Sequence, residues 1–475
     1  MRQIFGGHRL AALGVAAIVA ASLSAPAAAE GLNPNQQLAF DVYKELVEIN
    51  TVTATGDTAQ AAEAMAARLR GAGFPEADVH AFSPAPRKGN LVARLRGSGA
   101  RKPILLVAHI DVVPASREDW STDPFKLIER DGYFYARGSG DDKYMAASFI
   151  ANLIRYRKEG YQPDRDIIVA LETDEEIFDK DALGIQWLLK NHRDLIDAEF
   201  ALNEGGGVGL KGGKPIRNSV QTSEKVSVSY SLTVRNKGGH SAAPVKDNAI
   251  YRLAAGLTRL SEFSFPVNLN ETTRAYFERT AQMEGGQVAE DLRAVLSGQV
   301  DPASPPVARL SANTGFNAQL RTTCVATMLE GGSAINALPQ QAVAKVNCRV
   351  MPGEPVDGVK ATLEKVLADD QIAVGQLDPA TLSAPSALSE DVIGPITKLS
   401  EEFWPGAVVL PTMSAGATDG SFLRNAGIPT YGHSGLAGDV GESRIHGRDE
   451  RIPVKSFFEG NEYLYRLVKA FAGGK

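Results

Sequence analysis

Cysteine is scarce in this sequence: the 475 residues include only Cys324 and Cys348. Two thiols are too few for a disulfide scaffold or a thiolate-bound metal cluster. No sign of charge dominates, because the net charge at pH 7 is only −6, which argues against nucleic acid and anionic membranes as partners. With 44% hydrophobic and 22% charged residues, the composition excludes collagenous, coiled-coil and disordered chains. We therefore expect a folded protein, and its length favours two domains.

Long apolar runs are absent after residues 1–29, and no later segment is apolar for long enough to span a bilayer. Residues 1–29 have the features of a secretory signal peptide. Arg2 and Arg9 supply a basic start, Leu10–Leu23 an apolar stretch and Ala27–Ala29 a small-residue cleavage site. We predict an exported protein, periplasmic or secreted, with no membrane contact after signal cleavage. An uncleaved anchor is the alternative.

The two cysteines lie in apolar-alternating stretches on either side of a turn-like segment, Gly331–Pro339. If these stretches pair antiparallel, Cys324 and Cys348 face each other, and an exported protein can oxidise such a pair. Two buried free thiols agree equally well with the sequence, because the geometry cannot be read from it.

The fold class follows from short apolar runs that alternate with helical spacing. Residues 104–108, 167–171 and 198–202 suit strands buried on both faces, and residues 145–154 show one apolar helix face. This pattern predicts an α/β domain with a mostly parallel sheet flanked by helices. In such sheets, ligands bind at the carboxyl ends of the strands.

The pattern changes near Ser223, where strict alternation over Val226–Val234 indicates a half-exposed strand. A smaller α+β unit follows, and the α/β style returns after about Ala384. We therefore predict a discontinuous main domain, 30–222 and 384–475, with a smaller domain, 223–383, inserted into it. Within the smaller domain, residues 265–319 are polar and interrupted by Pro and Gly, which indicates a further insertion.

Five acidic residues and one histidine follow the predicted strands at the edge where ligands bind. They are His109, Asp111, Asp141, Glu175, Glu176 and Glu204. Gathering so many carboxylates in one crevice is prohibitive without cations, because like charges and desolvation raise their pKa values. Two divalent metal ions would supply the missing charge. Mixed imidazole and carboxylate ligands without thiolates suit zinc, with cobalt or manganese as substitutes.

At this point the sequence resembles a known family, the dinuclear-zinc metallopeptidases that include glutamate carboxypeptidase, carboxypeptidase S, aminoacylase and succinyl-diaminopimelate desuccinylase. The resemblance covers essentially the whole chain after residue 29, and the carboxypeptidase S branch is the closest in motif and insertion. The segments that carry it occur in the family's order: 109–114, 138–143, 173–176, 203–206, 238–244, 336–339, 349–353 and 446–452.

The resemblance implies a catalytic zinc-peptidase domain and an inserted ferredoxin-like domain that acts as a lid and dimerisation unit. It also implies the ligand set. Asp141 would bridge two zinc ions, of which one also binds His109 and Glu204 and the other Glu176 and His446.

Three further residues take catalytic roles by the same resemblance. Asp111 would hold the His109 ring in place, and Glu175 would be the general base. His240 would polarise the scissile carbonyl, often from the partner subunit of a homodimer formed through the inserted domain.

A second group of residues would bind substrate. Arg349 matches the family arginine that binds a substrate carboxylate with a two-pronged donor. Asn336, Gly416 and Thr418 fall in matching segments and would line the same subsite. His433 either contacts substrate or is a structural histidine.

The predicted function is therefore that of an exported zinc hydrolase acting on a small peptide next to its C-terminal amino acid, as a carboxypeptidase or dipeptidase. Hydrolysis of an N-acyl amino acid, as in aminoacylases, is the alternative. A non-catalytic periplasmic binding protein is a third hypothesis, which the presence of every predicted ligand and of the base disfavours.

Overall fold

The structure is a computed structural model that describes residues 31–177, 181–298, 301 and 303–475. The predicted signal peptide, residues 1–29, lies outside the described residues. Among the residues described, no helix combines the length and the apolar character that crossing a bilayer requires.

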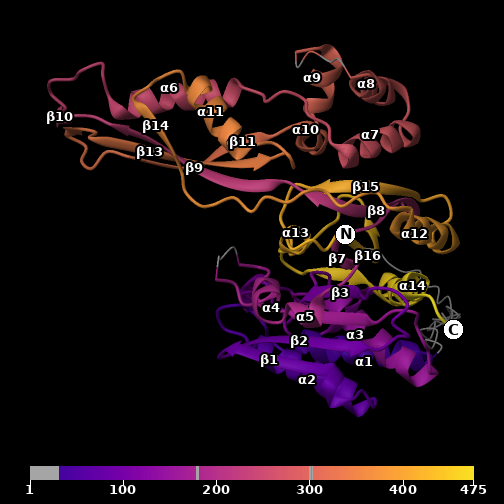
Figure 1. Cartoon of the computed structure of the whole chain (residues 1–475). Coiled ribbons are helices and arrows are strands. Elements are labelled where there is room, and N and C mark those ends of the chain that lie inside the picture. The colour runs from indigo at the N-terminus through magenta and orange to yellow at the C-terminus, as the bar shows by residue number, and fades with distance from the viewer. Residues whose placement is uncertain (1–30, 178–180, 299–300, 302) are drawn as a thin grey trace, which may run out of the picture.

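An eight-stranded sheet forms the centre of the larger part of the molecule (Figure 1). Its strand order is β1-β2-β6-β3-β7-β16-β8-β15, and the inner strands β6, β3, β7 and β16 run parallel to one another. Antiparallel pairings add β2 and β1 at one edge. The strands are β1 Val79–Ala85, β2 Lys88–Leu95, β3 Ile104–His109, β6 Ile167–Glu172, β7 Phe200–Lys211, β8 Lys214–Glu224, β15 Val408–Ser414 and β16 Thr430–Asp439. The predicted α/β fold with a mostly parallel sheet is confirmed.

Helices cover both faces of this sheet, because successive side chains of a strand point to opposite sides. Leu106 of β3 packs into the core under one set of helices, and Val107 packs into the core under the other. The first set is α1 Pro34–Glu48, α2 Thr58–Gly71, α3 Lys143–Glu159, α12 Glu390–Phe403 and α14 Val454–Ala472, and the second is α4 Ile185–Asn191, α5 Arg193–Ile196 and α13 Gly420–Asn425. Because the buried inner strands run parallel to one another, their carboxyl ends lie together at one edge of the sheet.

A separate antiparallel sheet, in the order β11-β13-β9-β14, extends away from the larger one (Figure 1). Its strands are β9 Val226–Arg235, β11 Thr323–Gly331, β13 Gln341–Val350 and β14 Ile372–Gln376. Helices α6 Ala249–Glu262 and α11 Val356–Leu367 cover one face and share a core with it. The alternating burial along β9 matches the expected half-exposed strand. The domain division at 222/223 and 383/384 stays a prediction.

The polar insertion folds into more helix than its composition suggested. It forms α7 Glu271–Met283, α8 Gly286–Leu296, α9 Pro305–Ser311 and α10 Thr314–Leu320 around a small core of its own. Local signals explain this, because Asn270 forms a capping box at the start of α7 and Pro305 occupies the first turn of α9. The Gln319 amide donates to the Met413 carbonyl at 2.7 Å, which ties the insertion to β15.

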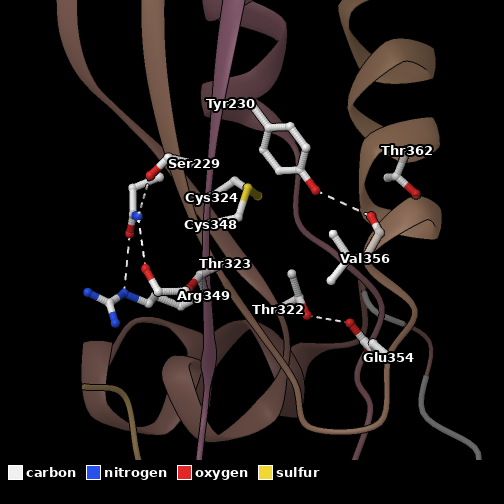
Figure 2. The surroundings of a disulfide bond; sticks show 12 residues. Ser229, Tyr230, Thr322, Thr323, Cys324, Cys348, Arg349, Glu354, Val356 and Thr362 are labelled. Atoms are coloured by element: carbon white, nitrogen blue, oxygen red, sulfur yellow. Dashed lines mark hydrogen bonds between the residues drawn. A yellow bond between two sulfur atoms is a disulfide. The ribbon is translucent and has the colours of Figure 1, made fainter. Parts of the chain in front are cut away.

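The two cysteines form a disulfide bond that joins β11 to β13 (Figure 2). Cys324 and Cys348 lie directly opposite each other in the antiparallel register of these strands. The pairing that the sequence left open is therefore a bridge within the smaller domain. Arg349 follows Cys348 directly, on the other face of β13.

Candidate active site

The ends of the parallel strands bring the predicted metal ligands to one edge of the sheet. His109 is the last residue of β3, and its side chain is buried. Glu175 and Glu176 follow β6, and Glu204 lies within β7. Because β6, β3 and β7 are neighbours in the sheet, these side chains meet across one crevice.

Asp141 lies at the centre of this crevice, in the loop between β5 (Tyr133–Tyr135) and α3. Its Oδ1 is 2.9 Å from His109 Nε2, and its Oδ2 is 3.1 Å from His446 Nε2. One carboxylate therefore presents a separate oxygen to each of two histidines, which is the arrangement that a ligand shared by two cations requires.

The remaining acids complete two groups around Asp141. Glu176 Oε1 lies 3.0 Å from His446 Nε2, and Glu204 Oε2 lies 3.9 Å from His109 Nε2. Ligand atoms of His109, Asp141 and Glu176 fall within 4.8 Å of one another, as do those of His109, Glu175 and Glu204. The structure thus brings together all five residues predicted as ligands, with Glu175 beside them.

The pKa values of these carboxyl groups indicate that the site needs positive charge. Burial, reinforced by the charges of Glu175 and Asp141, raises the pKa of Glu204 well above its usual value. Burial also raises the pKa of Glu175 to about 8. Carboxylates held this close resist ionisation, and divalent cations would remove that penalty. The donor set of two imidazoles and several carboxylates fits zinc, cobalt or manganese.

Asp111 faces the His109 ring and also contacts the loop that follows β6. The ring of His109 is held by the backbone carbonyl of Asp111, 3.0 Å from Nδ1, whereas the carboxylate Oδ1 is 3.7 Å away. The Asp111 carboxylate also accepts the backbone N–H groups of Glu175 and Glu176, at 3.3 and 3.2 Å. It therefore lies between the His109 ring and the loop that bears the proposed base.

A cavity of about 800 Å³ opens beside Glu175 and extends to the smaller domain. Arg349 and Thr418 line it, as predicted for substrate-binding residues. The Arg349 guanidinium donates through Nε to Asn347 Oδ1 at 3.2 Å, whereas its Nη1 is buried without a partner (Figure 2). Burial lowers the pKa of Arg349. An unpaired buried donor favours an anionic ligand at this wall of the cavity.

Three residues that were predicted to act on the substrate do not line this cavity in the same chain. His240 lies on the short strand β10 (Gly239–His240), which pairs with β12 (Ala337–Leu338) at the far tip of the smaller domain (Figure 1). Asn336 is beside it, and its carbonyl accepts the Ser241 N–H at 3.0 Å. His240, Asn336 and Gly416 are all exposed and do not line the cavity, although their segments match the motifs.

His433 is structural. Its Nδ1 donates to the Ser219 carbonyl at 2.9 Å, and its Nε2 accepts from the Tyr463 hydroxyl at 2.7 Å. Arg137 and Glu450 are residues that sequence reasoning passed over. Glu450 lies within the motif 446–452, and Arg137 directly precedes the motif 138–143. Only the structure shows that the two residues contact each other and the loops of Asp141 and His446.

The fold and the donor set together define the class of this protein as a metallohydrolase. Residues 105–470 match the model of peptidase family M20/M25/M40. The chain belongs to this family and is a hydrolytic enzyme, which confirms the resemblance seen in its motifs.

Relatives in the family carry different names. The chain is 30% identical to the human N-fatty-acyl-amino acid synthase/hydrolase PM20D1, over 78% of this chain and 74% of that protein. It is 29% identical to a probable carboxypeptidase S-like 2 from Dictyostelium discoideum, over 78% and 71% of the two chains. It is 25% identical to mouse aminoacylase-1, over 78% and 80%.

Solved structures agree on the fold. The M20 family metallo-carboxypeptidase Sso-CP2 from Sulfolobus solfataricus superposes with a TM-score of 0.68, at 19% identity, over 91% of this chain and 99% of that one. Human carnosine dipeptidase 1 gives a TM-score of 0.60 at 16% identity, over 92% and 96%. The sheet of this protein and its separate antiparallel sheet therefore follow an architecture shared across the family.

Proposed function

We propose that this protein is a dinuclear zinc hydrolase that cleaves the amide bond next to a C-terminal amino acid, as a carboxypeptidase or dipeptidase. The observation that carries the proposal is the position of Asp141, which offers one oxygen to His109 and the other to His446. His109 and Glu204 would hold one ion, Glu176 and His446 would hold the other, and Asp141 would bind both. Cobalt or manganese are the substitutes that the same donors accept.

The residues around the ligands suit amide hydrolysis. When bound, two divalent cations acidify water and polarise a carbonyl oxygen. Glu175 lies beside the ligands, and in this assignment it holds neither ion. Its carboxylate would take a proton from the attacking water and deliver it to the leaving amine.

Substrate orientation would come from the other wall of the cavity. The guanidinium of Arg349 has a free donor there, and a planar two-pronged cation suits the carboxylate of a C-terminal amino acid. A peptide whose terminal carboxylate contacts Arg349 would extend toward Glu175 and place its last amide bond near the ligands. This geometry favours cleavage at the carboxyl end of short peptides.

The proposal is tested by removing and restoring the metal. Protein stripped with a chelator should lose activity on a panel of dipeptides and tripeptides, and two equivalents of zinc per chain should restore it. Full activity of the metal-free protein would refute the metal-dependent mechanism. Undiminished ligand binding without metal or turnover would support the binding-protein hypothesis instead.

Deacylation of N-acyl amino acids is a second candidate, supported by the names of PM20D1 and aminoacylase-1. The same ligands, base and carboxylate-binding arginine serve both reactions, because both substrates carry an amide beside an amino acid. N-acyl amino acids assayed next to peptides separate the two. Cleavage of acyl amino acids alone would overturn the peptidase proposal.

A homodimer formed through the smaller domain would account for the exposed positions of His240 and Asn336. Strand β11 is an edge strand, and apolar side chains of β11 and α6 are exposed, including Leu329 and Tyr251. We propose that these surfaces pair and bring His240 to the partner's cavity, where it would polarise the scissile carbonyl. Light scattering tests this, and a monomer that retains full activity would contradict it.

Export is part of the proposal and depends on the signal-like residues 1–29 alone. N-terminal sequencing of the protein recovered from the periplasm or medium tests it. A mature chain that begins near Glu30 is expected, and one that begins at Met1 would contradict it.

A further inference from the structure

The carboxylate of Glu450 is buried beneath the loop that carries Asp141, and only 1% of the residue is exposed. Its Oε1 accepts the backbone N–H groups of Gly140 and Asp141, at 2.8 and 3.3 Å, and its Oε2 accepts that of Gly138 at 3.1 Å. Backbone N–H groups that converge in this way form a nest for an anion. Glu450 therefore fixes the backbone of the residue that contacts both histidines.

Arg137 extends the contact to two further loops. Its Nη1 donates to Glu450 Oε2 at 2.7 Å, and its Nη2 donates to the carbonyl of Gly447 at 3.0 Å, with His446 O at 3.5 Å and Pro114 O at 3.4 Å. Only 3% of Arg137 is exposed. One buried guanidinium thus joins its own loop to the loop of His446 and to the segment that follows β3.

These contacts link two ligands from distant parts of the sequence. Asp141 Oδ2 and His446 Nε2 lie 3.1 Å apart, and the backbone of each residue is held by a member of the same buried ion pair. We propose that Glu450 and Arg137 are positioning residues that set the separation of Asp141 and His446, and hence the affinity for the metal ion that both would bind. This inference rests on the two-metal site of the proposed function.

A buried ion pair can also serve the fold alone, and breaking one is destabilising wherever it lies. The two roles differ in their consequences. If the pair positions the ligands, its loss should weaken metal binding by more than general destabilisation would. Groups behind metal ligands typically contribute roughly ten- to a hundredfold to metal affinity. Metal binding is therefore the measurement that separates them.

The test is a calorimetric zinc titration of metal-stripped wild-type protein and of Glu450→Gln. Glutamine keeps the shape but replaces one acceptor oxygen with an NH₂ group, so either Gly138 and Arg137 or Gly140 and Asp141 lose their acceptor. We expect one zinc equivalent to bind roughly ten- to a hundredfold more weakly than in the wild type. The free energy of unfolding in chelator, measured on the same samples, reports the structural contribution.

Asp166→Asn is the matched control. Asp166 accepts the Gly97 N–H at 2.8 Å and Arg94 Nη1 at 2.7 Å, so it makes the same kinds of contact at the opposite end of β6. This variant should lose stability and keep wild-type zinc affinity. Arg137→Lys serves as a second variant if Glu450→Gln does not fold, and it should weaken zinc binding in the same direction because lysine lacks the two-pronged geometry.

Three results have distinct meanings. Zinc affinity in Glu450→Gln and Arg137→Lys equal to that of the wild type would overturn the positioning role while leaving the proposed function intact. A loss of affinity in Asp166→Asn as large as that in Glu450→Gln would also overturn it, because general destabilisation would then suffice. Failure of the wild type itself to bind two equivalents would refute the proposed function, and the positioning role with it.

Discussion

The carboxylate Oδ2 of Asp111 lies 3.2 Å from the backbone nitrogen of Glu176. The acid that follows strand β3 therefore holds the loop that follows strand β6, and with it both the proposed base and a proposed ligand. This contact gives Asp111 a role through the protein backbone, in addition to the contact of its Oδ1 with the His109 imidazole at 3.7 Å.

Asp111→Asn should weaken zinc binding and turnover, because an amide keeps one acceptor oxygen and places an NH₂ group against a backbone N–H. A loss of roughly ten- to a hundredfold in zinc affinity is expected from the general effect of such supporting contacts. Calorimetric titration measures it. Wild-type affinity in this variant would show that the loop keeps its position without the carboxylate.

Glu175→Gln should keep both metal ions and lose turnover, because it removes the group proposed to transfer the proton. A fall in kcat of about 10²–10⁴-fold is expected from the usual contribution of general base catalysis. Metal analysis and steady-state kinetics check the two parts separately. The adjacent Glu176→Gln is the contrast, since it should lose metal as well as activity. Turnover at the wild-type rate in Glu175→Gln would assign the base elsewhere.

Arg349→Lys should raise KM for substrates with a free C-terminal carboxylate while changing kcat less. Losing one of two charge-assisted hydrogen bonds corresponds to roughly a ten- to hundredfold increase in KM. Peptides with an amidated C-terminus give the discriminating measurement, since the variant should distinguish them from free acids less well than the wild type does. Lys345→Met, at an exposed cation on the same strand, is the control and should behave like the wild type.

Replacing both cysteines, in Cys324→Ala/Cys348→Ala, should lower the free energy of unfolding by about 3 kcal/mol, because the bond closes a loop whose ends are 24 residues apart. Urea denaturation measures the difference. Thiol titration of the denatured, unreduced wild type should find no free thiol. Detection of two would contradict the bridge.

His433 should make stability depend on pH below neutrality. Burial lowers its pKa from 6.5 to about 4. Between these values the unfolded chain binds a proton that the folded chain does not, so this contribution to stability is complete above pH 6.5 and is lost as the pH falls toward 4. The loss is on the order of 3 kcal/mol.

Urea denaturation at several pH values, in chelator, checks this effect. His433→Gln should show a weaker fall in stability between pH 7 and pH 4 than the wild type. Tyr463→Phe removes the hydroxyl that contacts the same imidazole but keeps the imidazole buried, so it should retain the dependence on pH. If the free energy of unfolding fell equally with pH in His433→Gln and in the wild type, the effect could not be assigned to His433.

The sequence alone was enough to predict the fold class and to name acidic residues and histidines that the structure brings together. Strands buried on both faces appear as continuous apolar runs, so the runs that contain Leu106 and Val169 could be recognised without coordinates. Side chains that follow such strands, those of His109 and Glu176 among them, could be predicted to meet because parallel strands end at one edge. Helices of the insertion were harder to foresee, since local signals such as the Asn270 cap mark only where a helix begins, and packing around residues such as Phe277 is also needed to stabilise it.

Only the tertiary structure decided which groups contact one another. Glu450 and Arg137 are 313 residues apart in sequence, and no periodicity could show that they form one buried pair behind Asp141. The same holds for the carboxylate of Asp111, which contacts the loop of Glu176 as well as the neighbouring His109. Spacing along a strand fixes the side on which a residue lies, whereas its hydrogen-bond partner depends on how distant loops pack against it.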